Sequence, residues 1–435
     1  MGSLQDLIIF LFVPFIASLL LAIPVVYSLG IACAVFLLVS GTRIPPIIIA
    51  TEMYAAINVV ALLALPMFVM TGELLNRCKL TDRLILLSRQ LVGWLRGGLA
   101  HVNIVTSMFF AGISGSVLAD AASIGPLLIP SMIKEGYSRA FSAAVTASSS
   151  TIGAIIPPSI PLIIVGGQLQ ISIGGLFLAG VIPGIITGLA LMFVSYLICL
   201  WKGFGLRHPF EGVRATTMHT VRAAPVLIIP IWILGGILGG VFTPTEAGAI
   251  AVVYTILIST LFYRTLSLSD FFGAIDSTVR VTASALVIVA IAIVFGRILT
   301  FHQFPQQLVD IVLFFTENKF VLFLAMVVLF LFVGTFMDAL ANMIILGPML
   351  MPLALQGLDI HPIQYGMFLM YALLLGIITP PLGLVLFVVS PIADVSLERT
   401  SLAVLPFLFA QLLVLALIVF VPEITLALPR LAGLL

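Results

Sequence analysis

The sequence predicts an all-α membrane protein with many transmembrane helices, arranged as an inverted repeat. Of its 435 residues, 62% are hydrophobic and only 8% are charged, whereas soluble domains carry about 25% charged residues. Apolar runs of about twenty residues recur from end to end, and each is long enough to cross a bilayer as a helix. The formal net charge of +1 gives no reason to expect a nucleic-acid partner.

The duplication is visible in two small, polar, glycine-rich stretches. Gly112 to Pro130 matches Gly334 to Pro352 at an offset of 222 residues, which places Asp120 on Asn342. Downstream, two double-proline segments match at an offset of 223. Paired hydrophobic segments that are interrupted by glycine and proline indicate the substrate site of a transporter. A carboxylate at membrane depth is also costly and needs a functional reason.

The first quarter of the chain is predicted to hold a scaffold and an interfacial helix. Residues 1–75 contain the N-terminal scaffold spans, with a break at Pro24 and a kink at Pro66. Residues 76–98 are amphipathic, with leucines at helical spacing, which is typical of a helix lying in the membrane interface. This segment holds five cations against one anion, so the positive-inside rule places it on the cytoplasmic side.

The first transport repeat is predicted over residues 99–200. It begins with a re-entrant hairpin whose tip is the Gly112 stretch, continues with a span broken at Pro157-Pro158, and ends with a complete span. Residues 201–223 are predicted to be a cytoplasmic linker, because they carry Lys202, Arg207, Arg214 and Arg222.

The second half is predicted to repeat this order. Residues 224–299 hold scaffold spans, including one broken within 281–299, and Glu246 is expected to cap a helix there. Residues 300–319 are the second interfacial helix, 320–400 the second transport repeat with a hairpin and a break at Pro380-Pro381, and 401–435 the C-terminal span. Since 300–319 holds one cation against two anions, it is placed on the opposite face. The topology is therefore inverted, and we expect about eleven crossings, two re-entrant hairpins and two broken helices.

The two hairpin tips and the two helix breaks are expected to converge near the middle of the membrane. A double proline unwinds a helical turn and frees carbonyl groups. Carbonyls, hydroxyls and a carboxylate suit a hard cation such as sodium, and half-helix N-termini favour an anion. The sequence therefore predicts a sodium site beside a site for an anionic substrate.

Simpler explanations remain open for each of these features. The serines at 148–150 could serve only as small residues that allow close helix packing. Asp120 could be a structural hairpin cap, and Pro157-Pro158 a plain kink. Two roles are open to Arg297: extending to the interface, or meeting the carboxylate of a substrate. No His-Glu-x-x-His, Gly-x-Ser-x-Gly or Walker motif is present, so an enzyme or an ATP-driven pump is not expected.

Several motifs resemble the large membrane subunit of tripartite ATP-independent periplasmic (TRAP) transporters. The resemblance covers nearly the whole chain and is carried by seven segments: Met70–Leu75, Trp94–Ala100, Gly112–Ala122, Thr151–Ser159, Phe242–Ala247, Thr379–Pro381 and Ser396–Arg399. It implies a bacterial inner-membrane protein that imports organic acids, such as sialic acid or C4-dicarboxylates, with sodium and an elevator mechanism. It also implies two partners, a small four-helix membrane subunit and a periplasmic substrate-binding protein. Because the chain begins almost directly at the first spans of the family, the small subunit is expected to be a separate chain.

The resemblance also implies where the ligands bind. The implied sodium ligands are Ser114, Ser116, Asp120, Thr151, Gly153, Gly334, Thr335, Asp338, Asn342 and Thr379. The expected substrate-binding residues are Ser149, Ser150, Pro157, Pro158, Thr379, Pro380 and Arg297, although Arg297 does not follow from the family pattern. A stand-alone sodium-coupled dicarboxylate or anion carrier of the same superfamily is the alternative function. A membrane-embedded enzyme or a structural subunit is the alternative from another class.

Overall fold

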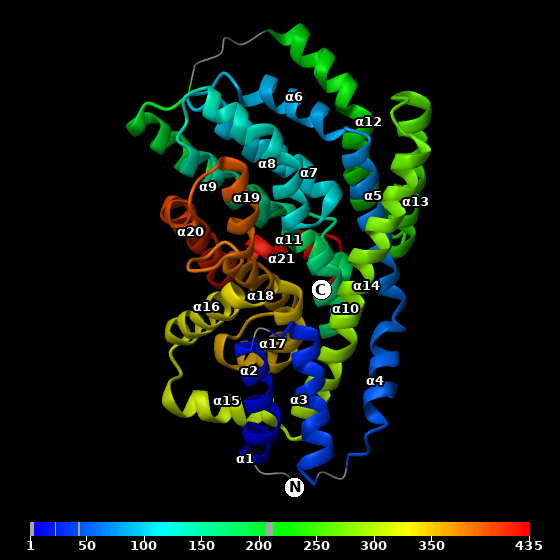
Figure 1. The fold of residues 1–435 in the computed structure, drawn as a ribbon, viewed down its shortest axis with the longest axis vertical. Coiled ribbons are helices and arrows are strands. Elements are labelled where there is room, and N and C mark those ends of the chain that lie inside the picture. Colours follow the sequence, from blue (N-terminus) through cyan, green and yellow to red (C-terminus); the bar gives the residue numbers. More distant parts are fainter. Residues whose placement is uncertain (1–3, 22, 42–43, 206–211) are drawn as a thin grey trace.

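The computed structural model describes residues 4–21, 23–41, 44–205 and 212–435, and all regular structure within these ranges is helical (Figure 1). Nine helical segments of this described part are long and apolar enough to cross a membrane. Three of them are the hairpin arms Val117–Lys134, Lys319–Phe336 and Ala339–Leu358. The number of complete crossings therefore stays a prediction, as does the role of Arg207, which lies outside the described residues.

The N-terminal helices confirm the break at Pro24 but not the kink at Pro66. The chain forms α1 (Leu4–Leu7), η1 (Ile8–Phe12), α2 (Val13–Leu20), α3 (Val25–Val39), α4 (Ile48–Ile57), η2 (Val60–Leu63) and α5 (Ala64–Arg77). The interruption falls at Asn58 and Val59, before η2. Pro66 lies in the first turn of α5, where its missing N–H disrupts no helical hydrogen bond.

The two amphipathic segments are helices at opposite ends of the molecule. They are α6 (Thr81–Val92) and α15 (Phe304–Phe315), which Figure 1 places near the top and near the bottom of the long axis. Leu84 and Leu87 of α6 are buried, whereas Leu91 is 40% exposed. The buried apolar face of α6 is thus shorter than predicted, since it ends before Leu91.

Hairpin 1 has a much shorter tip than predicted. Its arms are α7 (Gly98–Ser114) and α8 (Val117–Lys134), so only Gly115 and Ser116 are non-helical. Gly115 adopts a left-handed conformation with φ of 60°, which glycine takes at no steric cost. Ser116 then caps α8, since its Oγ accepts from the backbone N–H of Ala119 over 3.4 Å. Most of the Gly112 stretch is therefore helical.

Both predicted broken helices are present. The first consists of α9 (Arg139–Ser150), η3 (Thr151–Ala154) and α10 (Ile160–Leu169), and the second of α18 (Pro362–Gly376) and α19 (Leu384–Ala393). Each interruption contains a double proline. The long helix α11 (Ile173–Lys202) follows the first broken helix, and α20 (Leu397–Phe420) follows the second.

Two predictions about the middle of the chain are wrong. Helix α12 (Val213–Leu238) begins inside the predicted linker, and the span expected to break within 281–299 is part of the continuous α14 (Leu268–Phe301). The sequence of α14 has no proline and is strongly apolar, so nothing interrupts its hydrogen-bond ladder.

The expected cap at Glu246 is present. The Oε2 atom of Glu246 accepts from the backbone N–H of Thr243 over 2.8 Å. The capped helix is α13 (Pro244–Leu257), which lies between α12 and α14 in the sequence and is followed by η4 (Ile258–Phe262).

Hairpin 2 approaches the centre of the molecule from the end opposite to hairpin 1. Its arms are α16 (Lys319–Phe336) and α17 (Ala339–Leu353), which is followed by η5 (Ala354–Leu358). Figure 1 shows α7 and α8 in the upper half and α16 and α17 in the lower half. The chain ends with α21 (Glu423–Leu431), a helix that was not predicted separately from the C-terminal span.

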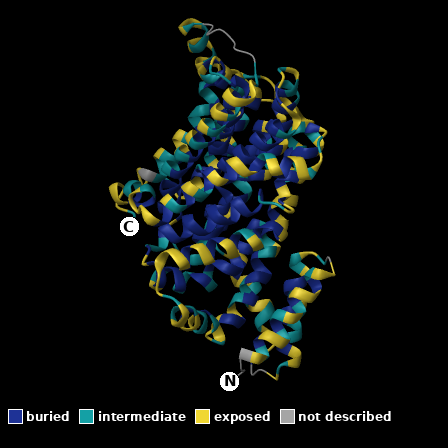
Figure 2. Ribbon diagram, turned by 90° about the vertical axis from the view of Figure 1, so that its left-hand side faces the viewer, coloured by how far each residue is buried: buried dark blue, intermediate teal, exposed yellow. Residues whose placement is uncertain are grey.

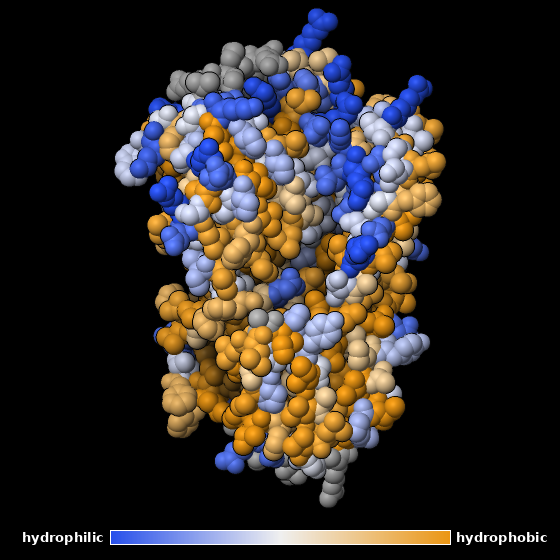
Figure 3. Space-filling view, viewed as in Figure 1, coloured by the Kyte–Doolittle hydropathy of each residue, from blue (hydrophilic) through white to orange (hydrophobic). Residues whose placement is uncertain are grey.

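The surface of the molecule is largely apolar, and one large hydrophobic cluster forms most of its core. Buried residues fill the middle of the structure (Figure 2), where Tyr365, Phe368 and Tyr371 of α18 are fully buried. Large apolar side chains are exposed on α12 to α14, including Ile231, Val253 and Phe272. In Figure 3 hydrophobic residues cover most of the visible face, and hydrophilic residues gather at the end that carries α6. This distribution fits a protein whose sides face lipid.

Candidate cation and substrate site

Asp120 is a carboxylate in the interior of the molecule. It lies on the first turn of α8 and is fully buried. Its Oδ1 lies 3.4 Å from Ser107 Oγ, whereas Oδ2 has no hydrogen-bond partner within the described part of the chain. A methyl group added at Gly153 would lie 3.2 Å from Oδ2 and 3.3 Å from the carbonyl oxygen of Ser116. The hairpin tip and the first helix break thus meet at this carboxylate.

A chain of buried polar side chains connects Asp120 to α9. Ser107 Oγ, which lies next to Asp120, is 3.2 Å from Ser149 Oγ. Ser149 in turn donates to Asn103 Oδ1 over 2.9 Å, and Asn103 Nδ2 donates to Thr146 Oγ1 over 2.7 Å. These residues lie on α7, α8 and α9, so one hydrogen-bonded network joins both hairpin arms to the first broken helix.

The prolines of the first break lie against the hairpin tip. The backbone N–H of Ile160 donates to the carbonyl of Gly115 over 3.2 Å. A methyl group at Gly115 would come within 2.8 Å of the Pro158 carbonyl, and one at Gly112 within 3.7 Å of the Pro157 carbonyl. Carbonyl oxygens of the break therefore lie against hairpin 1.

Two of the predicted serines have different surroundings. Ser114 is buried next to Gly72 of α5, and its hydroxyl has no partner in the described structure. Ser150 is also buried, but its Oγ donates back to the carbonyl of Thr146 over 2.6 Å. The back-bond of Ser150 is typical of a serine inside a helix.

In the second repeat, the hairpin arm α16 contacts the broken helix α18 through backbone atoms. Gly334 of α16 packs on Gly376 of α18 so closely that a methyl group at Gly334 would lie 2.9 Å from the Gly376 Cα. Asp338 caps α17, with its Oδ2 accepting from the backbone N–H of Leu340 over 2.9 Å. Asn342 is buried, and its Nδ2 lies 3.4 Å from the carbonyl of Met337.

The remaining second-repeat residues also lie at the tip and the break. The Thr335 hydroxyl donates to the Phe332 carbonyl and the Thr379 hydroxyl to the Leu375 carbonyl, each over 2.7 Å. Thr379 and Pro380 are partly exposed, in contrast to the fully buried Ser149. The second break is therefore the more accessible of the two.

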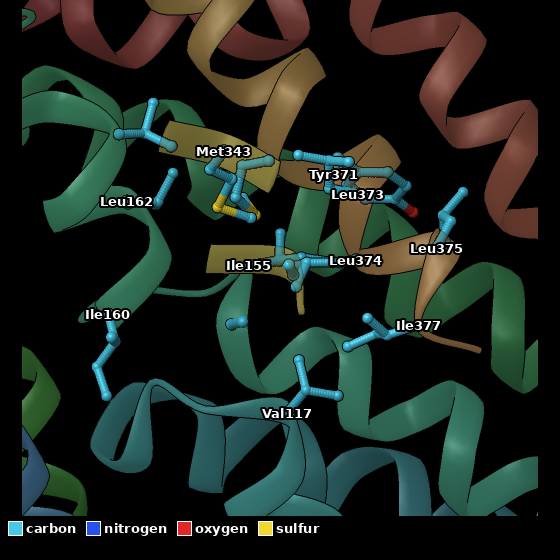
Figure 4. Packing of buried hydrophobic residues seen from close by; sticks show 14 of the residues in the cluster. Val117, Ile155, Ile160, Leu162, Met343, Tyr371, Leu373, Leu374, Leu375 and Ile377 are labelled. Carbon is cyan, nitrogen blue, oxygen red and sulfur yellow. The ribbon is translucent and has the colours of Figure 1, made fainter. Parts of the chain in front are cut away.

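Residues from hairpin 1, from both breaks and from α17 pack in one cluster of apolar side chains (Figure 4). Val117 comes from the start of α8, Ile155 from the first break, Ile377 from the second break and Met343 from α17. All four are buried. Hairpin 1, the two breaks and α17 thus share this part of the core, whereas the convergence of both hairpin tips stays a prediction.

Arg297 has a partner that the sequence did not indicate. Its Nε lies 3.1 Å from Oε1 of Glu52, which joins α14 to α4. Glu52 also lines a cleft of about 210 Å³, together with Val59, Gln168 and Gln170. The role of Arg297 in substrate binding stays a prediction.

Sequence reasoning missed four residues of the buried network: Asn103, Ser107, Thr146 and Gln411. Gln411 of α20 donates to the Thr151 hydroxyl over 2.7 Å and is fully buried. An available signal was the presence of Asn103 and Gln411 inside otherwise apolar segments, where polar side chains are costly and turn toward the protein interior. Within the described residues, no group of three or more His, Cys, Asp or Glu side chains could hold a metal ion. A cation site here would consist of hydroxyls, carbonyls and single carboxylates.

Comparison with known proteins identifies the family. A family model described as the DctM component of the tripartite ATP-independent periplasmic transporter matches residues 12–424. The sialic acid TRAP transporter large permease protein SiaM of Vibrio cholerae is 41% identical over 94% of this chain and 95% of its own length. The isethionate TRAP transporter permease protein DctMQ of Oleidesulfovibrio alaskensis is 37% identical over 95% of this chain and 65% of its own length.

A solved structure supports the fold. The YdaH transporter of Alcanivorax borkumensis matches with a TM-score of 0.60 and 17% identity, over 86% of each chain. At this identity the match concerns the fold alone. The family model and the sialic acid permease establish a multi-pass membrane permease rather than an enzyme. The chain belongs to the DctM family of TRAP transporter large permease subunits.

Proposed function

We propose that this chain uses a sodium gradient to import an organic acid, delivered by a periplasmic binding protein, across the bacterial inner membrane by an elevator movement. The observation that carries the proposal is Asp120, which is fully buried and whose Oδ2 has no partner within the described residues. A buried carboxylate that ionises needs a counter-charge. The described ion pairs do not include Asp120, so a bound cation is the natural counter-charge.

The surroundings of Asp120 favour a hard cation. The hydroxyl of Ser107 lies 3.4 Å from the carboxylate, and the carbonyl of Ser116 and the carboxylate both border the space beside Gly153. Hard cations prefer such oxygen ligands. In the second repeat, Asp338, Asn342 and the backbone near Gly334 are proposed as the matching site. Sodium binding would order both tips and complete the substrate site.

The substrate is proposed to be an organic anion. Helices α10 and α19 each begin after a break, and helix N-termini attract negative charge. The two permeases described above are named for sialic acid and for isethionate, and C4-dicarboxylates are the third class to test. Thr379 and Pro380, which are partly exposed, are proposed substrate contacts. The buried residues Ser149, Ser150, Pro157 and Pro158 are proposed as further contacts.

An elevator movement requires the two repeats to act as one body. Arg139, at the start of α9, lies 2.7 Å from the carboxylate of Asp394 at the end of α19 and also donates to the Ala393 carbonyl over 3.1 Å. Gln364 of α18 donates to the Ile418 carbonyl of α20 over 2.9 Å. We propose that the hairpins, the broken helices, α11 and α20 move together past a scaffold that contains α4, α5, α13 and α14.

Two partners complete the proposed transporter. The chain spans 65% of DctMQ, so that relative has room for a further membrane subunit in the same polypeptide. We propose that a small four-helix subunit of this kind joins the scaffold as a separate chain. The binding protein would dock on the periplasmic face and select the substrate.

The test is uptake into proteoliposomes that contain the chain and its four-helix partner. Accumulation of labelled sialic acid, C4-dicarboxylate or isethionate is measured with and without an inward sodium gradient and with and without each binding protein. Uptake that needs both sodium and one binding protein supports the proposal. Uptake without any binding protein would instead indicate a stand-alone carrier.

The same assay tests Arg297. If its guanidinium contacts the substrate, Arg297→Met raises the half-saturating substrate concentration about tenfold, since hydrogen bonds to charged groups contribute about 1.5–3 kcal/mol. Arg430→Met is the matched control, because Arg430 also forms an exposed ion pair, with Glu423 at 2.9 Å. An unchanged half-saturating substrate concentration in Arg297→Met would show that Arg297 does not contact the substrate and pairs only with Glu52.

A further inference from the structure

The final long helix of each repeat contacts the broken helix of the other repeat at an equivalent position. Helix α11 begins at Ile173 and α20 at Leu397, so Thr187 and Gln411 occupy the same place on their helices. The double-proline offset of 223 likewise relates Ser148 to Tyr371. The Thr187 hydroxyl lies 2.8 Å from the Tyr371 hydroxyl, and Gln411 Nε2 donates to the Ser148 carbonyl over 3.0 Å. The two contacts are therefore related by the internal repeat.

The contact made by Gln411 is the more elaborate one. Its Nε2 also lies 2.7 Å from the Thr151 hydroxyl, which itself donates to the Ser148 carbonyl over 2.7 Å. All three residues are fully buried. The amide thus bridges the last turn of α9 and the first residue of η3, where the helix begins to unwind.

The segment Ser148–Thr151 is linked to Asp120 in two ways. Thr151 begins the same short turn as Gly153, and Gly153 lies against the Asp120 carboxylate. Ser149 follows Ser148 and reaches Asp120 through Ser107. A shift of the segment at Ser148–Thr151 would therefore change the position of the oxygen atoms around Asp120.

Two buried polar atoms of this contact have no hydrogen-bond partner in the described structure. They are Gln411 Oε1 and Ser148 Oγ. Unpaired buried polar atoms are costly, and they are uncommon in proteins unless they have a functional reason. The sequence motifs gave no role to Gln411, and for Ser148 they offered only close helix packing.

We propose that Gln411 is a positioning residue for the cation site of the first repeat. Its amide group holds the first helix break at the geometry in which Asp120, Ser116 and the Gly153 turn bind sodium. The proposal rests on the sodium coupling proposed above. It places a determinant of sodium affinity on α20, a helix of the second repeat, so the two repeats together define one cation site.

The test compares Gln411→Met with a matched control, Gln364→Met. Gln364 is also a buried glutamine that donates to two carbonyls, those of Ile418 and Val419 on α20, at 2.9 and 2.8 Å. Both substitutions remove a buried amide of the same size. If Gln411 positions the site, Gln411→Met raises the half-saturating sodium concentration for uptake about tenfold, as is typical when a residue that orients a metal ligand is lost. Gln364→Met lowers the thermal midpoint but leaves the sodium dependence unchanged.

The maximal rate separates a positioning role from general damage. At saturating sodium, Gln411→Met is expected to transport at a rate within about twofold of the unsubstituted protein, because only the affinity for the cation is weakened. If Gln411→Met does not accumulate in the membrane, Gln411→Asn serves in its place, since its shorter side chain keeps an amide but withdraws it from Thr151. The same rise in half-saturating sodium concentration is expected.

The outcomes distinguish this proposal from the proposed function. The positioning role alone would be overturned if Gln411→Met had the same half-saturating sodium concentration as the unsubstituted protein. It would also be overturned if Gln364→Met raised that concentration as much as Gln411→Met does. An unsubstituted transporter whose uptake does not respond to sodium would overturn the sodium coupling and the positioning role together.

Discussion

Gly153 of the first helix break lies against Asp120 of hairpin 1, so closely that a methyl group at Gly153 would lie 3.2 Å from both Cβ and Oδ2 of the aspartate. The two residues are separated by a whole helix, α9, and are brought together because the hairpin tip packs into the break. The contact explains why a glycine stands at position 153, because a larger side chain there would crowd Asp120. It also makes the space beside the carboxylate easy to probe.

Gly153→Ala is expected to weaken sodium binding. The added methyl group would displace the carboxylate of Asp120 or the Ser116 carbonyl by a few tenths of an ångström, and small misplacement of ligands weakens a metal site about tenfold or more. The measurement is the sodium dependence of uptake. Gly296→Ala is the matched control, because a methyl group at Gly296 meets no atom within 4 Å. An unaltered sodium dependence in Gly153→Ala would show that this space is not part of the site.

Gly334→Ala and Gly376→Ala are expected to destabilise the fold. Each added methyl group would meet backbone rather than a flexible side chain, at 2.9 Å from the Gly376 Cα and at 2.7 Å from the Gly334 Cα, respectively. Overpacking of this kind costs about 1–3 kcal/mol. The thermal midpoint of the purified protein should fall for both variants but not for Gly235→Ala, where the methyl group meets nothing within 4 Å. Equal midpoints for all three would mean that α16 and α18 are not in this close contact.

Thr187→Val is expected to be more destabilising than Tyr371→Phe. Both remove the 2.8 Å contact between the two hydroxyl groups. Thr187 also donates to the Pro183 carbonyl, so it keeps a partner in Tyr371→Phe, whereas Thr187→Val leaves the fully buried Tyr371 hydroxyl without this partner. An unsatisfied buried group costs about 1–3 kcal/mol, against about 0.5–1.5 kcal/mol for a lost hydrogen bond. Thermal unfolding of the two variants gives the order, and the reverse order would contradict the assigned geometry.

The features that the sequence predicted well have local chemical signals. Double prolines mark both helix breaks, glycine and serine mark the tip of hairpin 1, and the Thr243–Glu246 pair marks a helix start. The matching offsets of the two halves predicted two hairpins and two broken helices. The amphipathic patterns predicted the helices α6 and α15, and their charges placed them at opposite ends of the molecule.

The features that were missed depend on tertiary context. No proline or glycine marks the interruption at Asn58–Val59. The continuity of α14 was missed although the absence of proline is a local signal for it, because the prediction followed the repeat instead. The short tip of hairpin 1 follows from the cap at Ser116, which allows α8 to begin before Asp120. Gln411 lies 260 residues from its partner Thr151, so only the packing of α20 on α9 reveals their contact.

The most direct test of the account is sodium-driven uptake by Asp120→Asn in proteoliposomes with the four-helix partner and a loaded binding protein. The substitution keeps the size of the side chain but removes the negative charge that the cation is proposed to balance. Asp359→Asn is the matched control, since Asp359 is an exposed carboxylate paired with Lys319 at 3.2 Å. The account predicts that Asp120→Asn loses sodium-dependent accumulation while Asp359→Asn retains it. Full sodium-dependent accumulation by Asp120→Asn would contradict the assignment of this carboxylate to the cation site.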